Sequence, residues 1–192
     1  MRTQRAGQSA LLLLDAVAVL NEQAIEYAVI GAMAASVHGS LRASADADAL
    51  LSVTVPKLRN LSRAFEKAGF ATELRRGDED DPIPALLMVS DTHGNRVDLL
   101  GGLRGLDPQA FARAVDVPFS GGNLRVIGRE DFIAMKCFAG GPQEIVDARV
   151  ALHSALAPID FDLLRRVTCR FGRAAADVLE QISAAPPQTK RM

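Results

Sequence analysis

Two aspartates separated by a single residue are the most chemically specific feature of the chain. Asp46 and Asp48 introduce a mostly apolar run that ends at Val53. If residues 46–53 form a β-strand, side chains two positions apart share a face, so both carboxylates point into one site. Carboxylate oxygens are ligands that Mg²⁺ takes in proteins, together with waters or substrate phosphates. The spacing therefore indicates a divalent-cation site.

A third acid lies further along the chain. Asp98 stands in the middle of the segment RVDLL, residues 96–100, where aspartate is an uncommon choice for a strand. The apolar run 85–89 and the turn-forming residues 91–95 precede it, which predicts a β-hairpin. If this strand lies beside 46–53, three carboxylates converge and repel one another unless cations neutralise them. Two Mg²⁺ ions and a nucleoside triphosphate would supply that neutralisation.

A glycine turn stands upstream of these acids. The apolar residues 27–30 lead into Gly31 and Ala32, and small residues continue to His38. This pattern predicts a strand, a tight turn and a short helix. A helix N-terminus presents backbone N–H groups that favour phosphate, so the turn is a candidate phosphate cradle.

In this combination the chain resembles the nucleotidyltransferase superfamily, which has the DNA polymerase β-like fold. The resemblance is greatest to its small bacterial "minimal" members and to the AbiEii-like toxin branch of type IV toxin–antitoxin systems. The family pattern is a strand, a Gly turn, a short helix, an Arg, a Ser or Thr, an Asp-x-Asp strand and a third acid. The matching positions are Gly31, Ala32, Arg42, Ser44, Asp46, Asp48 and Asp98.

The AbiEii-like branch adds a Lys and an Asp on later helices, which match Lys136 and Asp147. The resemblance covers roughly residues 24–152. It departs from the family at Ala32, where a Ser would donate to phosphate, and Ser36 or Ser40 is a candidate replacement. It departs again at residues 140–144, where the toxin branch often carries Arg-Asp.

The resemblance implies Mg²⁺-dependent transfer of a nucleoside monophosphate from a nucleoside triphosphate, with Mn²⁺ as an alternative metal. Asp46, Asp48 and Asp98 would hold the metals, and Lys136 would join them in catalysis. The implied nucleotide-binding residues are Gly31, Ala32, Ser36, Arg42, Ser44, Lys136 and Asp147. The implied acceptor is tRNA, a protein hydroxyl or a small molecule such as an aminoglycoside, and a toxin would have a separate antitoxin chain. The alternative is a catalytically degenerate module that binds a nucleotide or a protein.

Each candidate also has a structural interpretation that the sequence leaves open. Arg42 could simply pair with an aspartate, Lys136 could lie on the solvated face of a helix, and Asp147 could be an ordinary helix-surface acid. His38 is expected to pack behind the Gly turn or to hydrogen-bond a loop carbonyl.

Composition limits the class of protein. The 192 residues carry a formal net charge of −1, which argues against a general electrostatic surface for nucleic acid, although residues 63–76 or 165–173 could form a local basic groove. Two cysteines without metal-ligand spacing favour a reduced, cytoplasmic chain. The apolar run 11–20 contains Asp15 and is too short to span a bilayer, so no membrane association is expected.

The periodicity predicts an α/β (α+β) fold, a mixed β-sheet flanked by helices and followed by a C-terminal helical subdomain. Expected strands are 26–30, 46–53, 71–74, 85–89, 96–100, 115–119 and 124–127. Expected helices are 9–23, 32–38, 56–67, 107–114, 129–138, 142–156, 160–171 and 172–182. We assign residues 1–127 to the α/β core, 128–184 to the helical subdomain and 185–192 to a disordered tail.

Overall fold

The computed structural model describes residues 1–41 and 45–184. Its elements in chain order are α1 (Ser9–Glu22), β1 (Tyr27–Val29), α2 (Gly31–Val37), β2 (Ala47–Leu51), α3 (Val55–Lys67), β3 (Ala71–Arg76), β4 (Ala85–Ser90), β5 (Arg96–Leu100), β6 (Val115–Phe119), β7 (Gly122–Val126), α4 (Arg129–Ala139), α5 (Pro142–His153), α6 (Phe161–Cys169) and α7 (Arg173–Ala184). None of the helices in these two ranges is both long enough and apolar enough to cross a membrane.

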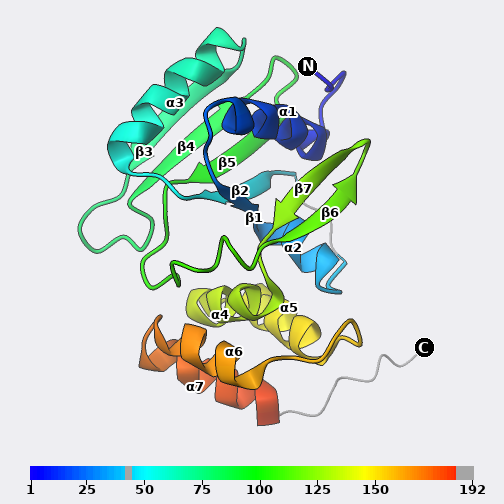
Figure 1. The fold of residues 1–192 in the computed structure, drawn as a ribbon, viewed down its shortest axis with the longest axis vertical. Coiled ribbons are helices and arrows are strands. Elements are labelled where there is room, and N and C mark those ends of the chain that lie inside the picture. The colour runs from blue at the N-terminus through cyan, green and yellow to red at the C-terminus, as the bar shows by residue number, and fades with distance from the viewer. Residues whose placement is uncertain (42–44, 185–192) are drawn as a thin grey trace.

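The strands form one seven-stranded mixed sheet in the order β3-β4-β5-β2-β1-β7-β6 (Figure 1). The central strand β2 is antiparallel to β1 and parallel to β5, and β1 is parallel to β7. The other neighbours pair antiparallel. A mixed sheet flanked by helices is the fold class expected from the sequence, and that prediction is confirmed.

Helices α1 and α3 pack against the strands β2 to β5 and β7. The α3 sequence explains its place, because Leu58, Leu61 and Phe65 recur at helical spacing and are all buried, while the residues between them are mostly polar. Pro56 lies in its first turn, and Gly69 follows its end with a positive φ of 91°. The helix therefore covers the sheet with one narrow apolar face.

From α4 onward the described chain is helical, and α4 packs against α5, α6 and α7 (Figure 1). The Arg129 guanidinium stabilises this group by donating to four carbonyl oxygens near the end of α5, those of Ala151, Leu152, Ser154 and Ala157. These donations satisfy acceptors that a helix end leaves without partners. One hydrophobic core cluster contains residues of the sheet and of all four helices.

The strand β1, next to the central strand β2, carries the only tyrosine of the sequence, Tyr27. Its side chain is buried, and its hydroxyl oxygen accepts a hydrogen bond from the backbone N–H of Arg125 at 3.2 Å. Burial raises the pKa of Tyr27 above its ordinary value, and the Arg125 N–H and charge oppose that rise only in part.

The helix predicted over residues 107–114 is wrong, because the structure has consecutive turns there. Asp107 Oδ1 accepts from the N–H of Gln109, which closes a local turn and does not cap a helix. The carbonyl of Phe111 accepts from the Arg125 guanidinium at 2.8 Å, so a side chain of β7 holds this turn. Arg113 makes a bidentate pair with buried Asp131, both distances 2.7 Å. Tertiary contacts thus override a weak local preference in a short segment.

Two further predictions need adjustment. The strand expected over 46–53 is shorter, since β2 begins at Ala47 and ends at Leu51, and Asp46 immediately precedes it. Arg42 and Ser44 lie outside the described residues, as does the tail predicted for 185–192.

Candidate active site

The structure brings Asp48 and Asp98 together as direct partners in the register of β2 and β5. Neighbouring strands lie about 4.8 Å apart, and register partners point to the same face of the sheet. Every other residue of β2 is buried, whereas Asp48 is partly exposed. The two carboxylates therefore share an opening on one face of the sheet, with Asp46 just ahead of β2.

The glycine turn lies directly against this pair. Gly31 begins α2 with a φ of +62°, and the Ile30 N–H donates to the Asp48 carbonyl at 2.9 Å. A Cβ at position 31 would overlap Oδ2 of Asp48. Glycine is thus required here by its backbone conformation and by the carboxylate that fills the space beside it.

The carboxylates of the cluster repel one another electrostatically, and this repulsion affects their pKa values. Burial raises the pKa of Asp48 above its ordinary value, and the negative charges of Asp98 and Asp46 raise it further, against smaller opposing effects of Lys136 and Arg96. Burial also raises the pKa of Asp98, although the nearby Arg96 lowers it in part. Among the described residues, Arg96 and Lys136 balance the negative charge of the three acids only in part.

Among the described residues, Arg96 is a cation in direct contact with this cluster. Its Nη2 lies 3.1 Å from Oδ2 of Asp46 and 3.1 Å from Oδ2 of Asp98, and its Nε lies 3.0 Å from Oδ1 of Asp98. Sequence reasoning did not assign Arg96 to the site. The strand alternation could have predicted it, because residues 96 and 98 of one strand point to the same face.

Three carboxylates are a suitable donor set for a hard divalent cation. Oδ1 of Asp98 is buried and accepts no well-formed hydrogen bond in the described part of the chain, despite the nearby Arg96 Nε. Within residues 1–41 and 45–184, however, no three His, Cys, Asp or Glu side chains stand ready as a metal site. The donors fit a metal in kind, but the guanidinium lies between two of them.

Lys136 and Asp147 form a second part of the site. Lys136 Nζ lies 3.2 Å from Oδ2 of Asp147 and 3.6 Å from Oε1 of Glu144, and the lysine side chain is only 11% exposed. Ser40 donates to Oδ1 of Asp147 at 2.8 Å, and Gln143 donates to the same oxygen at 3.1 Å. Lys136 is therefore not on a solvated helix face, and its charge reaches Asp48.

The pKa of Asp147 lies below its ordinary value although the residue is completely buried. Burial alone would raise the pKa of Asp147, but the hydrogen bonds from Ser40, Gln143 and Lys136, with the lysine charge, together lower it. The interpretation of Asp147 as an ordinary helix-surface acid is wrong. This carboxylate holds Lys136 in place.

The remaining predicted residues lie around these groups. Ala32 is buried and has no polar side-chain atom. Ser36 donates to the Ala32 carbonyl at 3.1 Å and lines an apolar cavity with residues of β6 and β7, so its hydroxyl is not directed at the acids. His38 Nε2 lies 2.8 Å from the Ile127 carbonyl, which confirms its predicted packing role.

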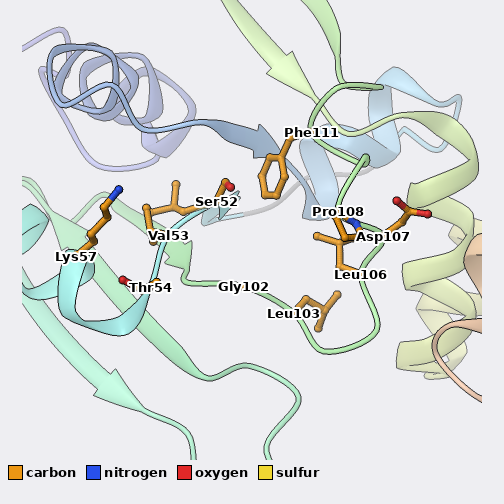
Figure 2. A pocket seen from close by; sticks show the side chains of 11 residues that line it. Ser52, Val53, Thr54, Lys57, Gly102, Leu103, Leu106, Asp107, Pro108 and Phe111 are labelled. Atoms are coloured by element: carbon orange, nitrogen blue, oxygen red, sulfur yellow. The ribbon is translucent and has the colours of Figure 1, made fainter.

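A cavity of about 380 Å³ lies beyond the opposite end of β2 from Asp46. Lys57 of α3 stands at one side, and Leu103, Leu106 and Phe111 from the chain between β5 and β6 stand at the other (Figure 2). None of the predicted site residues lines it. The acid cluster is therefore a separate feature.

Comparisons with known proteins agree with this architecture. No protein-family model and no curated protein matches the chain. Among solved structures, the antibiotic-resistance factor ANT(2'')-Ia in solution is similar with a TM-score of 0.59 and 14% identity, over 89% of this chain and 94% of that one. A crystal structure of ANT(2'')-Ia in complex with adenylyl-2''-tobramycin gives 0.56 and 14%, over 84% and 95%.

A third similar structure is an antigenic nucleotidyltransferase-like protein from Paracoccidioides brasiliensis, with a TM-score of 0.54 and 15% identity over 95% of both chains. These similarities extend over most of each chain. At such low identity they establish the fold, and the chain shares the fold of these nucleotidyltransferase structures.

Proposed function

We propose that the protein is a nucleotidyltransferase that moves a nucleoside monophosphate from a nucleoside triphosphate to a hydroxyl acceptor. The observation that carries this proposal is the register pairing of Asp48 with Asp98 beside the Gly31 turn. Three mutually repelling carboxylates destabilise a protein unless a cation or substrate compensates. In the reaction, the acceptor oxygen bonds to the α-phosphorus, the bond from that phosphorus to pyrophosphate breaks, and the acceptor loses its hydroxyl proton.

Each side chain has a role that its environment supports. Asp46, Asp48 and Asp98 would hold Mg²⁺ or Mn²⁺, and the metal would supply charge stabilisation at the phosphates. Asp98 would also accept, or help to polarise, the proton of the acceptor hydroxyl. Lys136, held by Asp147, would neutralise charge on the leaving pyrophosphate. The turn at Gly31 and Ala32 would present backbone N–H groups to the triphosphate, with Arg42 and Ser44 as further contacts.

The structural neighbours support the class of acceptor to be tested first. One of them is a complex with an adenylylated aminoglycoside, and the similarity covers 84% of this chain and 95% of that one. We therefore place small hydroxyl-bearing molecules first, and tRNA and protein hydroxyls second. If the protein is an AbiEii-like toxin of the cytoplasm, its expression will arrest growth, Asp46→Asn will abolish that arrest, and a separate antitoxin chain will relieve it.

Calorimetry with each of the four nucleoside triphosphates tests the proposal. We expect one nucleotide to bind in the presence of Mg²⁺ or Mn²⁺, and Asp48→Asn to remove that binding. Asp162→Asn on α6 is the matched control, since this carboxylate is 95% exposed and, within residues 1–41 and 45–184, pairs only with Arg165 at 3.9 Å. Absence of binding for all four nucleotides would overturn the enzyme proposal.

A catalytically degenerate module is the alternative, and Ala32 favours it because its side chain has no hydroxyl to offer phosphate. A module would keep its binding partner when Asp48 is changed to Asn. An enzyme would lose incorporation of label from an α-³²P nucleotide into its acceptor. The same variant therefore separates the two functions.

A further inference from the structure

The Arg96 guanidinium occupies the position between two of the proposed metal ligands. It contacts Oδ2 of Asp46 and both carboxylate oxygens of Asp98, at 3.0–3.1 Å. Within the described residues, the Arg96 guanidinium forms hydrogen bonds and ion pairs only with these two acids. A positive group thus already bridges the two carboxylates that a metal would bridge.

We propose that Arg96 is a built-in counter-ion that competes with the divalent cation. The metal must displace the Arg96 side chain before Asp46 and Asp98 can bind the metal. This inference rests on the proposed function, because it concerns the same metal site. It explains why three acids lie together without forming a ready metal site among the described residues. Two cations placed at one pair of carboxylates would repel each other, so binding of one releases the other.

The surroundings of Arg96 permit such an exchange without moving the strand. Its backbone N–H is held by Ser9 Oγ at 3.1 Å, and Ser9 Oγ in turn donates to the Ala45 carbonyl at 2.6 Å, next to Asp46. The Ser9 hydroxyl thus holds the main chain just ahead of both Asp46 and Asp98. The Arg96 side chain is 44% exposed, so the long guanidinium arm can move into solvent while the carboxylates stay in place.

Metal binding measured without nucleotide gives the direct test. Calorimetric titration with Mn²⁺ alone compares wild type with Arg96→Met, which keeps the length of the side chain and removes its charge. We expect Mn²⁺ to bind the variant roughly tenfold more tightly, as two partly exposed ion pairs no longer oppose it. Arg96→Lys, with a more compact cation, should give an intermediate affinity.

Arg75→Met is the control for a general change in the electric field. Arg75 lies on the same sheet and influences Asp98, but its recorded ion pair is with Glu73. We expect its Mn²⁺ affinity to stay within about twofold of wild type. An equal effect of both variants, or no effect of Arg96→Met, would overturn the counter-ion role while leaving the metal site standing. No Mn²⁺ binding by either protein would overturn this inference together with the proposed function.

A second measurement on the unaltered protein covers the case in which Arg96→Met does not fold. The Nε–H resonance of Arg96, assigned by its loss in Arg96→Lys, should shift on addition of Mg²⁺, and its hydrogen should exchange faster with water once the guanidinium leaves the acids. A resonance that stays unchanged at saturating Mg²⁺ would contradict displacement.

Discussion

Gly31 and Asp48 constrain each other more closely than any other pair in the site. The carboxylate of Asp48 fills the space that a side chain at position 31 would need. The left-handed backbone at Gly31 adds a second restriction on the same residue. Because Gly31 has no Cβ, the first turn of α2 can approach the Asp48 carboxylate on β2 closely.

Gly31→Ala should therefore destabilise the protein by more than its backbone strain. We expect about 1–2 kcal/mol for the positive φ and about 1 kcal/mol or more for the overlap with Asp48. Gly140→Ala is the matched control, because Gly140 has a φ of +65° and a Cβ there would meet its nearest atoms only at 3.8 Å. Urea denaturation measures both variants, and equal losses would show that Asp48 simply moves aside.

Replacing Asp48 with Asn should stabilise the metal-free protein near neutral pH. The pKa of Asp48 is raised in the folded state, so the folded protein binds a proton more tightly than the unfolded chain. The contribution of Asp48 to stability is thus most favourable below the ordinary aspartate pKa, and it is lost as the pH rises through the raised folded-state value. The Asn variant should lack this pH-dependent loss and gain a few degrees in Tm at neutral pH.

Thermal melts of both proteins in EDTA across the acidic range check this prediction. Parallel curves for the two proteins would show that the acids do not repel one another in the folded state. The same curves with Mg²⁺ added should converge, because the metal neutralises the charge that Asn removes.

The helices α4 and α5 meet the chain that follows α2 through one buried carboxylate. Asp147 of α5 pairs with Lys136 of α4 and accepts from Ser40, which lies just after α2. The network therefore ties three segments that are distant in sequence. It also sets where the Lys136 ammonium stands relative to Asp48.

Asp147→Asn should reduce the free energy of unfolding by about 3 kcal/mol at pH 7, because it leaves Lys136 buried without its nearest anion. Ser40→Ala should cost about 1.5 kcal/mol and Gln143→Ala less, since Gln143 is exposed. The pKa of Asp147 is lowered, so its contribution is present above the ordinary aspartate pKa and is lost as the pH falls through the folded value. Urea denaturation at pH 7 and in acid measures all three variants, and an Asn variant as stable as wild type would contradict the buried pair.

Local patterns were sufficient for most elements, whereas the pairing of β2 with β5 that brings the acids together entered the prediction only as a condition. The strand β5 and its hairpin with β4 were predicted from two apolar runs around a turn. Strand alternation predicted that Asp46 and Asp48 point to the same face. The segment 107–114 was mispredicted because its conformation depends on Arg125 and Asp131, which lie outside it. Likewise, the contact of Lys136 with Asp147 joins two helices, and only the family resemblance suggested it. Contacts of this kind depend on tertiary packing, which periodicity does not encode.

The α/β core and the C-terminal helices contact each other directly at the proposed boundary between residues 127 and 128. Ile127 donates to the Val29 carbonyl at 3.0 Å, and the carbonyl of Ile127 contacts His38. Phe132 of α4 stacks near His38 with ring centroids 5.1 Å apart. The helical subdomain that we propose from residue 128 therefore shares its core with the sheet.

We expect the full chain to unfold in one cooperative transition. Separation of the two parts would expose the shared core and break the contacts of His38 and Asp147 at once. Differential scanning calorimetry should give a calorimetric enthalpy equal to the van't Hoff enthalpy. Two resolved peaks would instead mean that residues 128–184 fold independently.

The position of Tyr27 gives this protein an optical reporter of its own. The sequence has no tryptophan and this one tyrosine, so near-ultraviolet absorbance and fluorescence come chiefly from a single ring on β1, four residues before Gly31. Because the pKa of Tyr27 is raised in the folded state, its tyrosinate band should develop on alkaline titration only at higher pH than for a free phenol. Spectroscopy without any added label can thus follow the strand that leads into the candidate site.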